Sequence, residues 1–341
     1  MYSKLTSFAV CAWLVASPGA GLCDTITITP TIHSLDSLAL MTGMVFDGTS
    51  IWVADINKQV VRLNANYAIA QHFHLDGDIG ALAPGSGHTI YVTDPKTLWQ
   101  ISRDSGAVKK IPALGMNNCN QEGIAADGPF VWVVNACEVD NGSTNSVFSS
   151  LLLRINPQTG ERNLVTLATI GSGSNLLLIN QGKVWVNGDD CSVVDANTLE
   201  FKTFKPSATA WVGPMAANTQ KVFLSAEGPD PGPQFVIAFD PATLTETART
   251  TLDLPLENIT ADDQNVVAFA ENRIYVLSAS DLTLQRVINI DSSLIQTHAQ
   301  AMFIHNGDIL VGDDELGAGI PNRILLFHDW RPTATSAAAP K

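Results

Sequence analysis

G-I-A-A-D-G-P-F-V-W-V-V-N, residues 123–135, contains the unit that the rest of the chain repeats. A short apolar run leads into a turn at Asp127, Gly128 and Pro129, and β-branched and aromatic residues follow from Val131 to Val134. This pattern is typical of a tight β-hairpin. Related hairpins occur throughout the chain, at residues 44–55, 81–94, 176–187, 215–225 and 301–313. We therefore take this hairpin as the repeating unit of the fold.

A second hairpin pattern, independent of the first, follows it in most repeats. Its copies lie at residues 154–161, 193–200, 238–245 and 276–283, with a looser copy at 101–107. Each repeat therefore has four strands, and the first strands are expected to begin near Gly43, Ile79, Gly123, Asn175, Met215, Ile259 and Ala301. Four-stranded units that recur every ~40–50 residues are typical of a β-propeller, whose blades bury their faces against one another. The sequence predicts an all-β, seven-bladed β-propeller of four-stranded antiparallel blades over residues 24–330.

The two ends of the chain differ from the repeats. Lys4 precedes an apolar stretch at residues 8–16 and small residues up to Gly21, which is the pattern of a secretory signal peptide over residues 1–23. No segment approaches the ~20 apolar residues that a membrane helix needs. Residues 331–341 are small and polar, and we expect a disordered tail there. We therefore expect a secreted or periplasmic protein, monomeric and without a membrane span.

Residues 25–32, T-I-T-I-T-P-T-I, alternate polar and apolar side chains at the period of a strand. They precede the first repeat, whereas the seventh repeat has only three strands, at 301–304, 309–312 and 323–328. We expect the N-terminal strand to complete the last blade and close the ring. The alternative is a leader strand that pairs with nothing.

Cys119 and Cys137 flank the hairpin of the third repeat. Antiparallel pairing brings these two positions together, and an exported chain permits a disulfide between them. Cys191 has no evident partner. The C-x-x-C spacing of a cysteine metal site does not occur in this sequence.

Polar residues recur at two places in the repeats that should share one face. In a propeller, the starts of the first strands and the ends of the second strands emerge on the same face, around the mouth of the central channel. First-strand starts carry Asp78, Glu122, Asn175, Asn258 and His298. Second-strand ends carry Asp55, Asp94, Asn135, Asn187, Glu227 and Asp313, with Glu315 just beyond. We call this predicted surface the acidic face.

Two interpretations of the acidic face stay open. Carboxylates that converge at a channel mouth bind hard cations through oxygen, so Asp55, Glu122 and Asp313 are candidate ligands for Mg²⁺ or Ca²⁺. In this first, functional interpretation a cationic ligand could also bind there, and the candidate residues for binding a small molecule or a protein are the wider set, Asp55, Asp94, Asn135, Asn187, Glu227, Asp313 and Glu315. In the second interpretation, these side chains only accept hydrogen bonds from nearby backbone N–H groups in turns.

His298 is expected at the rim of the channel, and it is a candidate catalytic residue together with Glu122. It could act as a general base or metal ligand, or it could be only a hydrogen-bonding rim residue. Three long loops follow second strands on the same face, at residues 138–149, 228–234 and 315–321. Because long loops in compact domains are often functional, we expect a binding cup there. Neutral surface insertions are the alternative.

The composition narrows the class of partner. The chain is 45% hydrophobic and 15% charged, which suits a large all-β core. Its net charge of −14 argues against nucleic acid as a partner. Trp52, Trp132 and Trp185 hold the same place in successive second strands, and we expect them to pack between blades.

The repeated D-G-x-x-[I/V]-W-V hairpin, as at residues 47–53 and 127–133, resembles the streptogramin lyase group and related bacterial extracytoplasmic seven-bladed propellers. The resemblance lies at the level of single blades. In the lyases, histidines at first-strand starts and a nearby glutamate act with a magnesium ion to open a cyclic ester by elimination. T-H-A-Q at 297–300 places His298 where a lyase histidine would be. The second expected histidine is absent, since neighbouring starts are T-G-M at 42–44 and E-N-I at 257–259.

Two functions of different class follow from these observations. The first is an exported propeller that binds a ligand or protein partner on its acidic, loop-bearing face without catalysis. The second is a metal-assisted lyase or hydrolase that uses His298 and nearby carboxylates.

Overall fold

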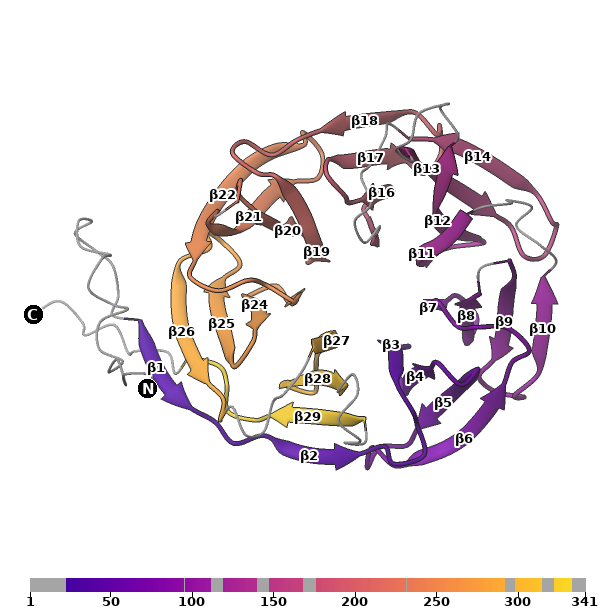
Figure 1. The fold of residues 1–341 in the computed structure, drawn as a ribbon, viewed down its shortest axis with the longest axis horizontal. Coiled ribbons are helices and arrows are strands. Elements are labelled where there is room, and N and C mark those ends of the chain that lie inside the picture. Colours follow the sequence, from indigo (N-terminus) through magenta and orange to yellow (C-terminus); the bar gives the residue numbers. More distant parts are fainter. Residues whose placement is uncertain are drawn as a thin grey trace, which may run out of the picture.

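The computed structural model describes residues 23–332, apart from residues 95, 112–118, 140–146, 168–175, 231, 292–297 and 315–321. All of the regular structure in this part of the chain is β-strand, and seven sheets surround a central axis (Figure 1). Each sheet is one blade, with four antiparallel strands ordered from the axis outward, and one sheet has a fifth strand at its outer edge. The predicted seven-bladed β-propeller is confirmed. Within the same part of the chain, no helix is long and apolar enough to cross a membrane.

Four consecutive segments of the chain form blades one to four. Blade one contains β3 (Met41–Phe46), β4 (Ile51–Asp55), β5 (Gln59–Leu63) and β6 (Ile69–His74). Blade two contains β7 (Ala81–Gly85), β8 (Thr89–Thr93), β9 (Leu98–Ser102) and β10 (Val108–Ile111). Blade three contains β11 (Cys119–Asp127), β12 (Phe130–Val139), β13 (Val147–Ile155) and β14 (Arg162–Thr166). Blade four contains β15 (Leu177–Asn180), β16 (Lys183–Val186), β17 (Cys191–Asp195) and β18 (Phe201–Phe204).

The last three blades include both ends of the described chain. Blade five contains β19 (Trp211–Ala217), β20 (Val222–Glu227), β21 (Gln234–Asp240) and β22 (Thr245–Leu252). Blade six contains β23 (Asn258–Ala261), β24 (Asn265–Ala270), β25 (Arg273–Ser278) and β26 (Leu284–Asn289), with β1 (Asp24–Thr27) at its outer edge. Blade seven contains β27 (His298–His305), β28 (Asp308–Asp314) and β29 (Arg323–Phe327), and β2 (Thr31–Ser34) completes it.

The N-terminal segment closes the ring as predicted, but with two strands instead of one. β2 pairs antiparallel with β29 and supplies the missing fourth strand of blade seven. β1 pairs in parallel with β26 and gives blade six a fifth strand. Residues 28–30, which end at Pro30, separate the two strands. Proline cannot donate a ladder hydrogen bond, so it suits the point where the chain passes from one sheet to the next.

The core consists of the contacts between neighbouring blades. The predicted packing role of the tryptophans is confirmed, because Trp52, Trp132 and Trp185 are fully buried. Trp52 of blade one, for example, packs in one cluster with Ile90 and Val92 of blade two. No blade could bury these side chains alone, so the ring folds as a unit.

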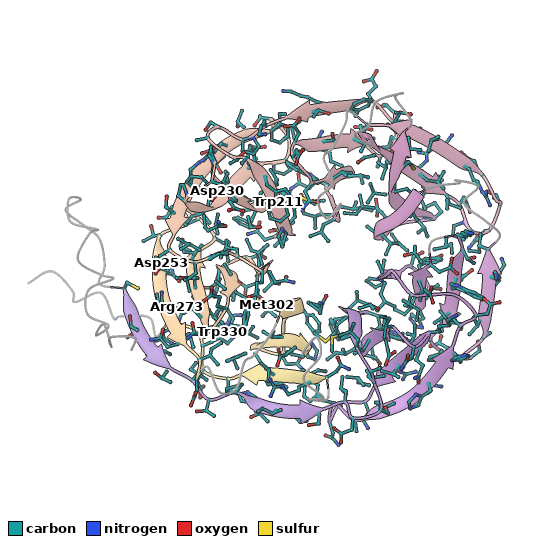
Figure 2. The ribbon with its side chains drawn as sticks, in the orientation of Figure 1. Trp211, Asp230, Asp253, Arg273, Met302 and Trp330 are labelled. Atoms are coloured by element: carbon teal, nitrogen blue, oxygen red, sulfur yellow. The ribbon has the colours of Figure 1, made fainter. Side chains whose placement is uncertain are left out.

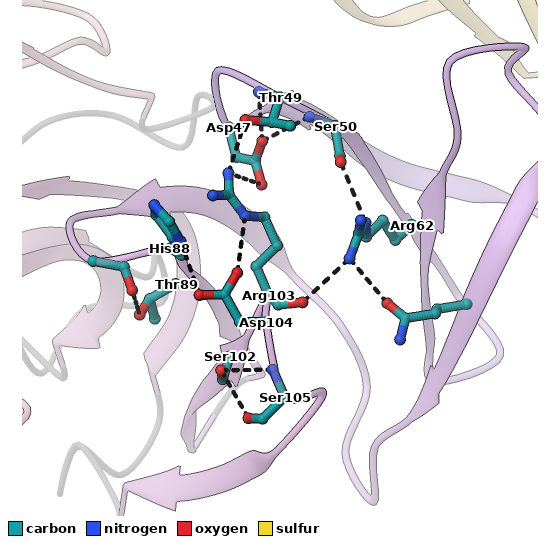
Figure 3. A network of polar contacts seen from close by, with 12 residues as sticks. Asp47, Thr49, Ser50, Arg62, His88, Thr89, Ser102, Arg103, Asp104 and Ser105 are labelled. Carbon is teal, nitrogen blue, oxygen red and sulfur yellow. Dashed lines mark hydrogen bonds and ion pairs between the residues drawn. The ribbon is translucent and has the colours of Figure 1, made fainter.

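Arginine side chains link blade one to blade two and blade three to blade four. Arg62 donates to the carbonyl of Arg103 at 3.2 Å, 41 positions later, and Arg154 donates to the carbonyl of Ala196 at 2.8 Å, 42 positions later. These separations are close to one repeat, so the same kind of bond recurs around the ring. Arg103 returns from blade two to blade one, where it bonds Thr49 at 3.0 Å (Figure 3).

The C-terminal end of the described chain packs against the last blades. The indole of Trp330 is fully buried and donates to the carbonyl of Gly307 at 2.6 Å. Arg331 lies over that ring and forms an ion pair with Asp262 at 2.6 Å. The predicted signal peptide, except for Cys23, and residues 333–341 of the predicted tail lie outside the described residues, so both stay predictions.

Candidate functional site

The first strands of alternate blades carry a β-bulge at the same end. The pairing register shifts in β3, β11, β19 and β27, at Met41/Gly43, Gln121/Gly123, Val212/Met215 and Ala299/Ala301. Bulges re-aim side chains and are over-represented beside active sites. The first strands are the innermost strands of the ring, so the four bulges lie around one mouth of the channel (Figure 1).

These bulges also correct the predicted strand boundaries. The first strands of blades one, three, five and seven begin two to four residues before the expected positions, at Met41, Cys119, Trp211 and His298. The extra residues are not regular alternating strand, so the periodicity begins only after the bulge. Pairing resumes before it, because a bulge interrupts a ladder without ending it.

Asp55 ends β4, and its carboxylate is completely buried. Its Oδ2 accepts a hydrogen bond from the backbone N–H of Ala39 at 2.6 Å, and Oδ1 accepts one from the N–H of Asn57. The carboxylate therefore joins the chain entering blade one to the hairpin that follows β4. Both oxygens are used by the backbone.

Asp94 and Asn187 occupy the corresponding place in blades two and four, and both are buried. Asp94 accepts hydrogen bonds from the N–H of Lys96 at 2.7 Å and from the indole N–H of Trp99 at 3.2 Å. Asn187 accepts one from the N–H of Leu176 at 2.5 Å and donates to the carbonyl of Val212 at 3.2 Å. These side chains hold turns and neighbouring blades together.

Asp313 and Asn135 complete the buried set. Asp313 is the last residue of β28 that pairs with β29, and it accepts a hydrogen bond from Nε of Arg323 at 2.8 Å. Asn135 is 1% exposed, and among the described residues its amide nitrogen has no hydrogen-bond partner. Four of the candidates therefore have hydrogen-bond partners within the fold: Asp55, Asp94, Asn187 and Asp313.

The candidate catalytic residues lie on blades that are not neighbours. His298 begins β27 of blade seven, and Glu122 lies in the bulge of β11 of blade three, with blades one and two between them (Figure 1). The side chains of both residues, and all of Glu315, lie outside the described residues. The predicted pair is therefore brought to the same mouth but from separate parts of the ring.

Glu257, which the sequence analysis did not select, is the carboxylate that contacts the start of β27. Its Oε2 accepts a hydrogen bond from the N–H of Ala299 at 2.9 Å, and its Oε1 accepts one from the N–H of Glu271 at 3.1 Å. Glu257 therefore fixes the residue that follows His298. Its position directly before the first strand of blade six is the sequence signal that could have found it.

Trp211 and Glu227 form a cross-strand pair at the mouth of the channel. Trp211 begins β19, Glu227 ends β20, and the two residues are direct partners in the antiparallel ladder. Both are partly exposed. In the described part of the chain, the Glu227 carboxylate makes no hydrogen bond or ion pair. Figure 2 shows Trp211 on the inner part of blade five.

The structure describes two of the three predicted loops, at residues 138–149 and 228–234, in part. Residues 138–139 and 147–149 continue β12 and β13 as paired strands, so the expected loop at 138–149 is shorter than predicted. The loop at 315–321 lies outside the described residues. The loop after Glu227 is closed by a hydrogen bond from the N–H of Gly228 to the carbonyl of Pro233 at 2.9 Å. A side chain at Gly232 would collide with the carbonyl of Gly228, so the loop is tight.

Asp55 and Asp313, two of the candidate metal ligands, already bind other groups. Across the described ranges, no group of three or more His, Cys, Asp or Glu side chains is placed to hold a metal ion. Asp55 and Asp313 would have to exchange the bonds that they form with backbone N–H groups and with Arg323 before they could bind one. The metal site with Glu122 stays a prediction.

Comparisons with known proteins place the chain by its fold. The structure is similar to virginiamycin B lyase from Staphylococcus aureus, with 14% identity and a TM-score of 0.66 over 87% of this chain and 98% of that chain. A catalytically inactive histidine-to-alanine variant of that lyase, solved with quinupristin, is similar at 13% identity and a TM-score of 0.66, over 87% of this chain and 98% of that chain. These likenesses establish the fold alone.

Propellers of other kinds are similar as well. BamB from Moraxella catarrhalis matches at 12% identity and a TM-score of 0.55, over 88% of this chain and 97% of that chain. The Pan2 WD40 domain of Neurospora crassa matches at 8% identity and a TM-score of 0.65, over 89% of this chain and 95% of that chain. No family model and no curated protein matches the sequence. The predicted resemblance to streptogramin lyases is confirmed at the level of the fold.

Proposed function

We propose that this chain is an exported β-propeller that binds a ligand or a protein partner at the channel mouth, on its acidic face, without catalysis. The observation that carries the proposal is the set of four bulges at the same end of β3, β11, β19 and β27. A bulge locally disrupts the hydrogen bonds of the ladder and the regular packing, and it often re-aims a side chain. Four bulges around one mouth favour a binding site there.

A ligand screen followed by hydrogen exchange tests the proposed site. Amino acids, short peptides, sugars, nucleosides, organic acids and amines are screened by thermal shift, because a ligand that binds only the folded state raises the melting temperature. Each stabilising compound is then mapped by hydrogen–deuterium exchange mass spectrometry. We expect slower exchange at residues 41–43, 119–123, 211–215 and 298–301. Protection confined to the opposite face, for example at turns 64–68 and 240–245, contradicts the proposal.

Export is tested separately from binding. Residues 1–30 are fused to alkaline phosphatase without its own signal, since that enzyme is active only after it reaches an oxidising compartment. We expect activity from this fusion and none from a fusion in which the apolar stretch at residues 8–16 carries two arginines. Equal activity of the two fusions would contradict export.

A metal-assisted lyase or hydrolase is the second candidate, and one contact favours it. Glu257 binds the backbone of Ala299, so a carboxylate lies beside the residue that follows His298. Quinupristin, the compound in the structure of the inactive lyase variant, is the substrate to test. Magnesium-dependent elimination that disappears in His298→Ala would support this candidate. This candidate is contradicted if there is no turnover and if calcium or magnesium causes no thermal shift in chelator-treated protein. Binding without catalysis is then the function that is left.

A further inference from the structure

We infer that Trp211 and Glu227 form a binding site for an organic cation that carries an ammonium or guanidinium group. The inference rests on the proposed binding at the channel mouth and names the chemical class that this part of it recognises. An indole offers the most favourable aromatic face to a cation, and a carboxylate supplies the opposite charge.

The pairing register places the two side chains together. Trp211 lies directly opposite Glu227 in the β19–β20 ladder. Side chains of directly opposed residues lie on the same face of a sheet, with Cβ atoms ~5 Å apart. Phe223 is on that face as well, two pairs further along β20, and it packs against the core of blade six. The pair therefore lies at the mouth end of the face where blade five meets blade six.

Gly213 positions the indole along the strand. A Cβ atom at Gly213 would lie 2.6 Å from Cζ3 and 2.8 Å from Cη2 of Trp211. A side chain at position 213 would have to displace the indole, so the six-membered ring lies over the glycine. The bulge at Gly213 and Pro214 therefore leaves a space that the indole occupies.

Other aromatic rings of this protein already have a cation of their own. Lys110 lies over Trp99 at 4.7 Å, and Arg249 lies over Phe235 at 4.7 Å. Within the described ranges no Lys or Arg lies over Trp211, although it begins a strand beside a free carboxylate. Trp211 therefore lacks an internal cation of the kind that covers Trp99 and Phe235.

The surroundings of the pair favour a positive ligand. The chain carries a net charge of −14, which attracts cations over long distances. Asp230, three residues after Glu227 in the chain, is an exposed carboxylate that adds to the negative charge of this region.

Fluorine NMR tests the site directly. The protein is labelled with 5-fluorotryptophan, and the resonance of Trp211 is assigned by its loss in Trp211→Phe. Choline, N-acetyl-lysine amide and N-acetyl-arginine amide are titrated separately, so that a quaternary ammonium ligand is distinguished from a basic side chain. The neutral control is 3,3-dimethylbutanol, which has the shape of choline without its charge. The Trp99 resonance is the internal control, because Lys110 already covers that ring.

We expect at least one cation to move the Trp211 resonance to saturation, while the neutral analogue and Trp99 show no such change. Glu227→Gln should raise the dissociation constant about tenfold, because it removes the charge and keeps the shape. The inference is overturned if 3,3-dimethylbutanol shifts the Trp211 resonance equally. It is also overturned if no cation shifts that resonance while the labelled protein keeps the melting temperature of the unlabelled protein. If cations fail while another ligand still protects the first-strand starts in hydrogen exchange, the proposed function stands and only the cation site is wrong.

Discussion

Arg286 of blade six forms an ion pair with Asp24 of the N-terminal strand, with 2.7 Å between Nη2 and Oδ2, across 262 positions of sequence. The same guanidinium donates hydrogen bonds to the carbonyls of Asp329, Trp330 and Arg331 at 2.8–3.3 Å. One buried side chain therefore holds both ends of the described chain against β26. The closure of this propeller depends on this contact as well as on the pairing of β2 with β29.

Arg286→Met should destabilise the protein by about 2–3 kcal/mol, because it leaves one carboxylate and three carbonyl groups without their donor. Methionine keeps much of the buried volume, so the loss reports the polar contacts. The free energy of unfolding in urea at neutral pH measures it. Asp24→Asn is the matched control, because the Asp24 side chain is 51% exposed and exposed ion pairs contribute less than about 1 kcal/mol. Equal losses in the two variants would show that the ion pair, and not the carbonyl contacts, carries the effect.

The two N-terminal strands should differ in importance. A chain that begins at residue 29 lacks β1, and β26 then has the same open edge as the outer strands of other blades. We expect it to stay monomeric with a modestly lower melting temperature. A chain that begins at residue 35 also lacks β2, which exposes β29 as an unpaired edge, and we expect it to aggregate. Light scattering after size-exclusion chromatography measures both. If the shorter chain stays monomeric and keeps its melting temperature, the strand is not needed for closure.

A Cys119–Cys137 disulfide stays a prediction, and the ladder supports it. The two residues are directly opposed in β11 and β12, and Cα atoms of opposed residues lie ~4.5–5.5 Å apart, a separation that a disulfide can bridge. Replacing both cysteines with alanine should cost about 3 kcal/mol under oxidising conditions in the chain-entropy model. Reduction should lower the melting temperature of the natural protein but not of the double variant. Non-reducing peptide mapping that found both thiols free would disprove the bond.

Asp47 should make stability depend on acid pH. Burial alone raises the pKa of Asp47, but hydrogen bonds from Ser50, Trp52 and Thr49 and the charge of Arg103 outweigh it and hold the pKa below its usual range. Figure 3 shows the contacts of Asp47 with Thr49, Ser50 and Arg103. The unfolded chain therefore binds the proton more tightly. The stabilisation is fully present above the ordinary aspartate value of about 3.9 and is lost as pH falls through the lower folded pKa.

Asp47→Asn should therefore cost about 1–2 kcal/mol at neutral pH, and the difference from the natural protein should shrink below pH ~4. Urea unfolding at pH 7 and pH 3 measures both values. Asp36→Asn is the control, because Asp36 is exposed and makes no hydrogen bond with another residue in the described ranges. A pH-independent cost for Asp47→Asn would assign the effect to packing.

The fold could be predicted from the sequence because its signals are local. Alternating apolar residues and turns such as Asp127–Gly128 mark each hairpin within about a dozen positions, and the repeat then leaves a propeller as the consistent arrangement. The N-terminal alternation and the three-stranded seventh repeat together predicted closure. The same reasoning could not divide 25–32 into two strands, because which sheet edge each strand meets is a contact between distant segments.

The site depended on the tertiary structure. Asp55 and Glu227 occupy the same place in their repeats. The carboxylate of Asp55 is buried and accepts hydrogen bonds from backbone N–H groups, whereas the carboxylate of Glu227 is partly exposed beside Trp211. Trp211 itself was missed, because Gly213 and Pro214 read as the end of a turn before a strand expected at Met215. The ladder continues through them as a bulge. Composition and spacing predicted where polar side chains gather, whereas only the tertiary structure decided which of them the fold uses, because a side chain's hydrogen-bond partners depend on the turns and strands that folding brings beside it.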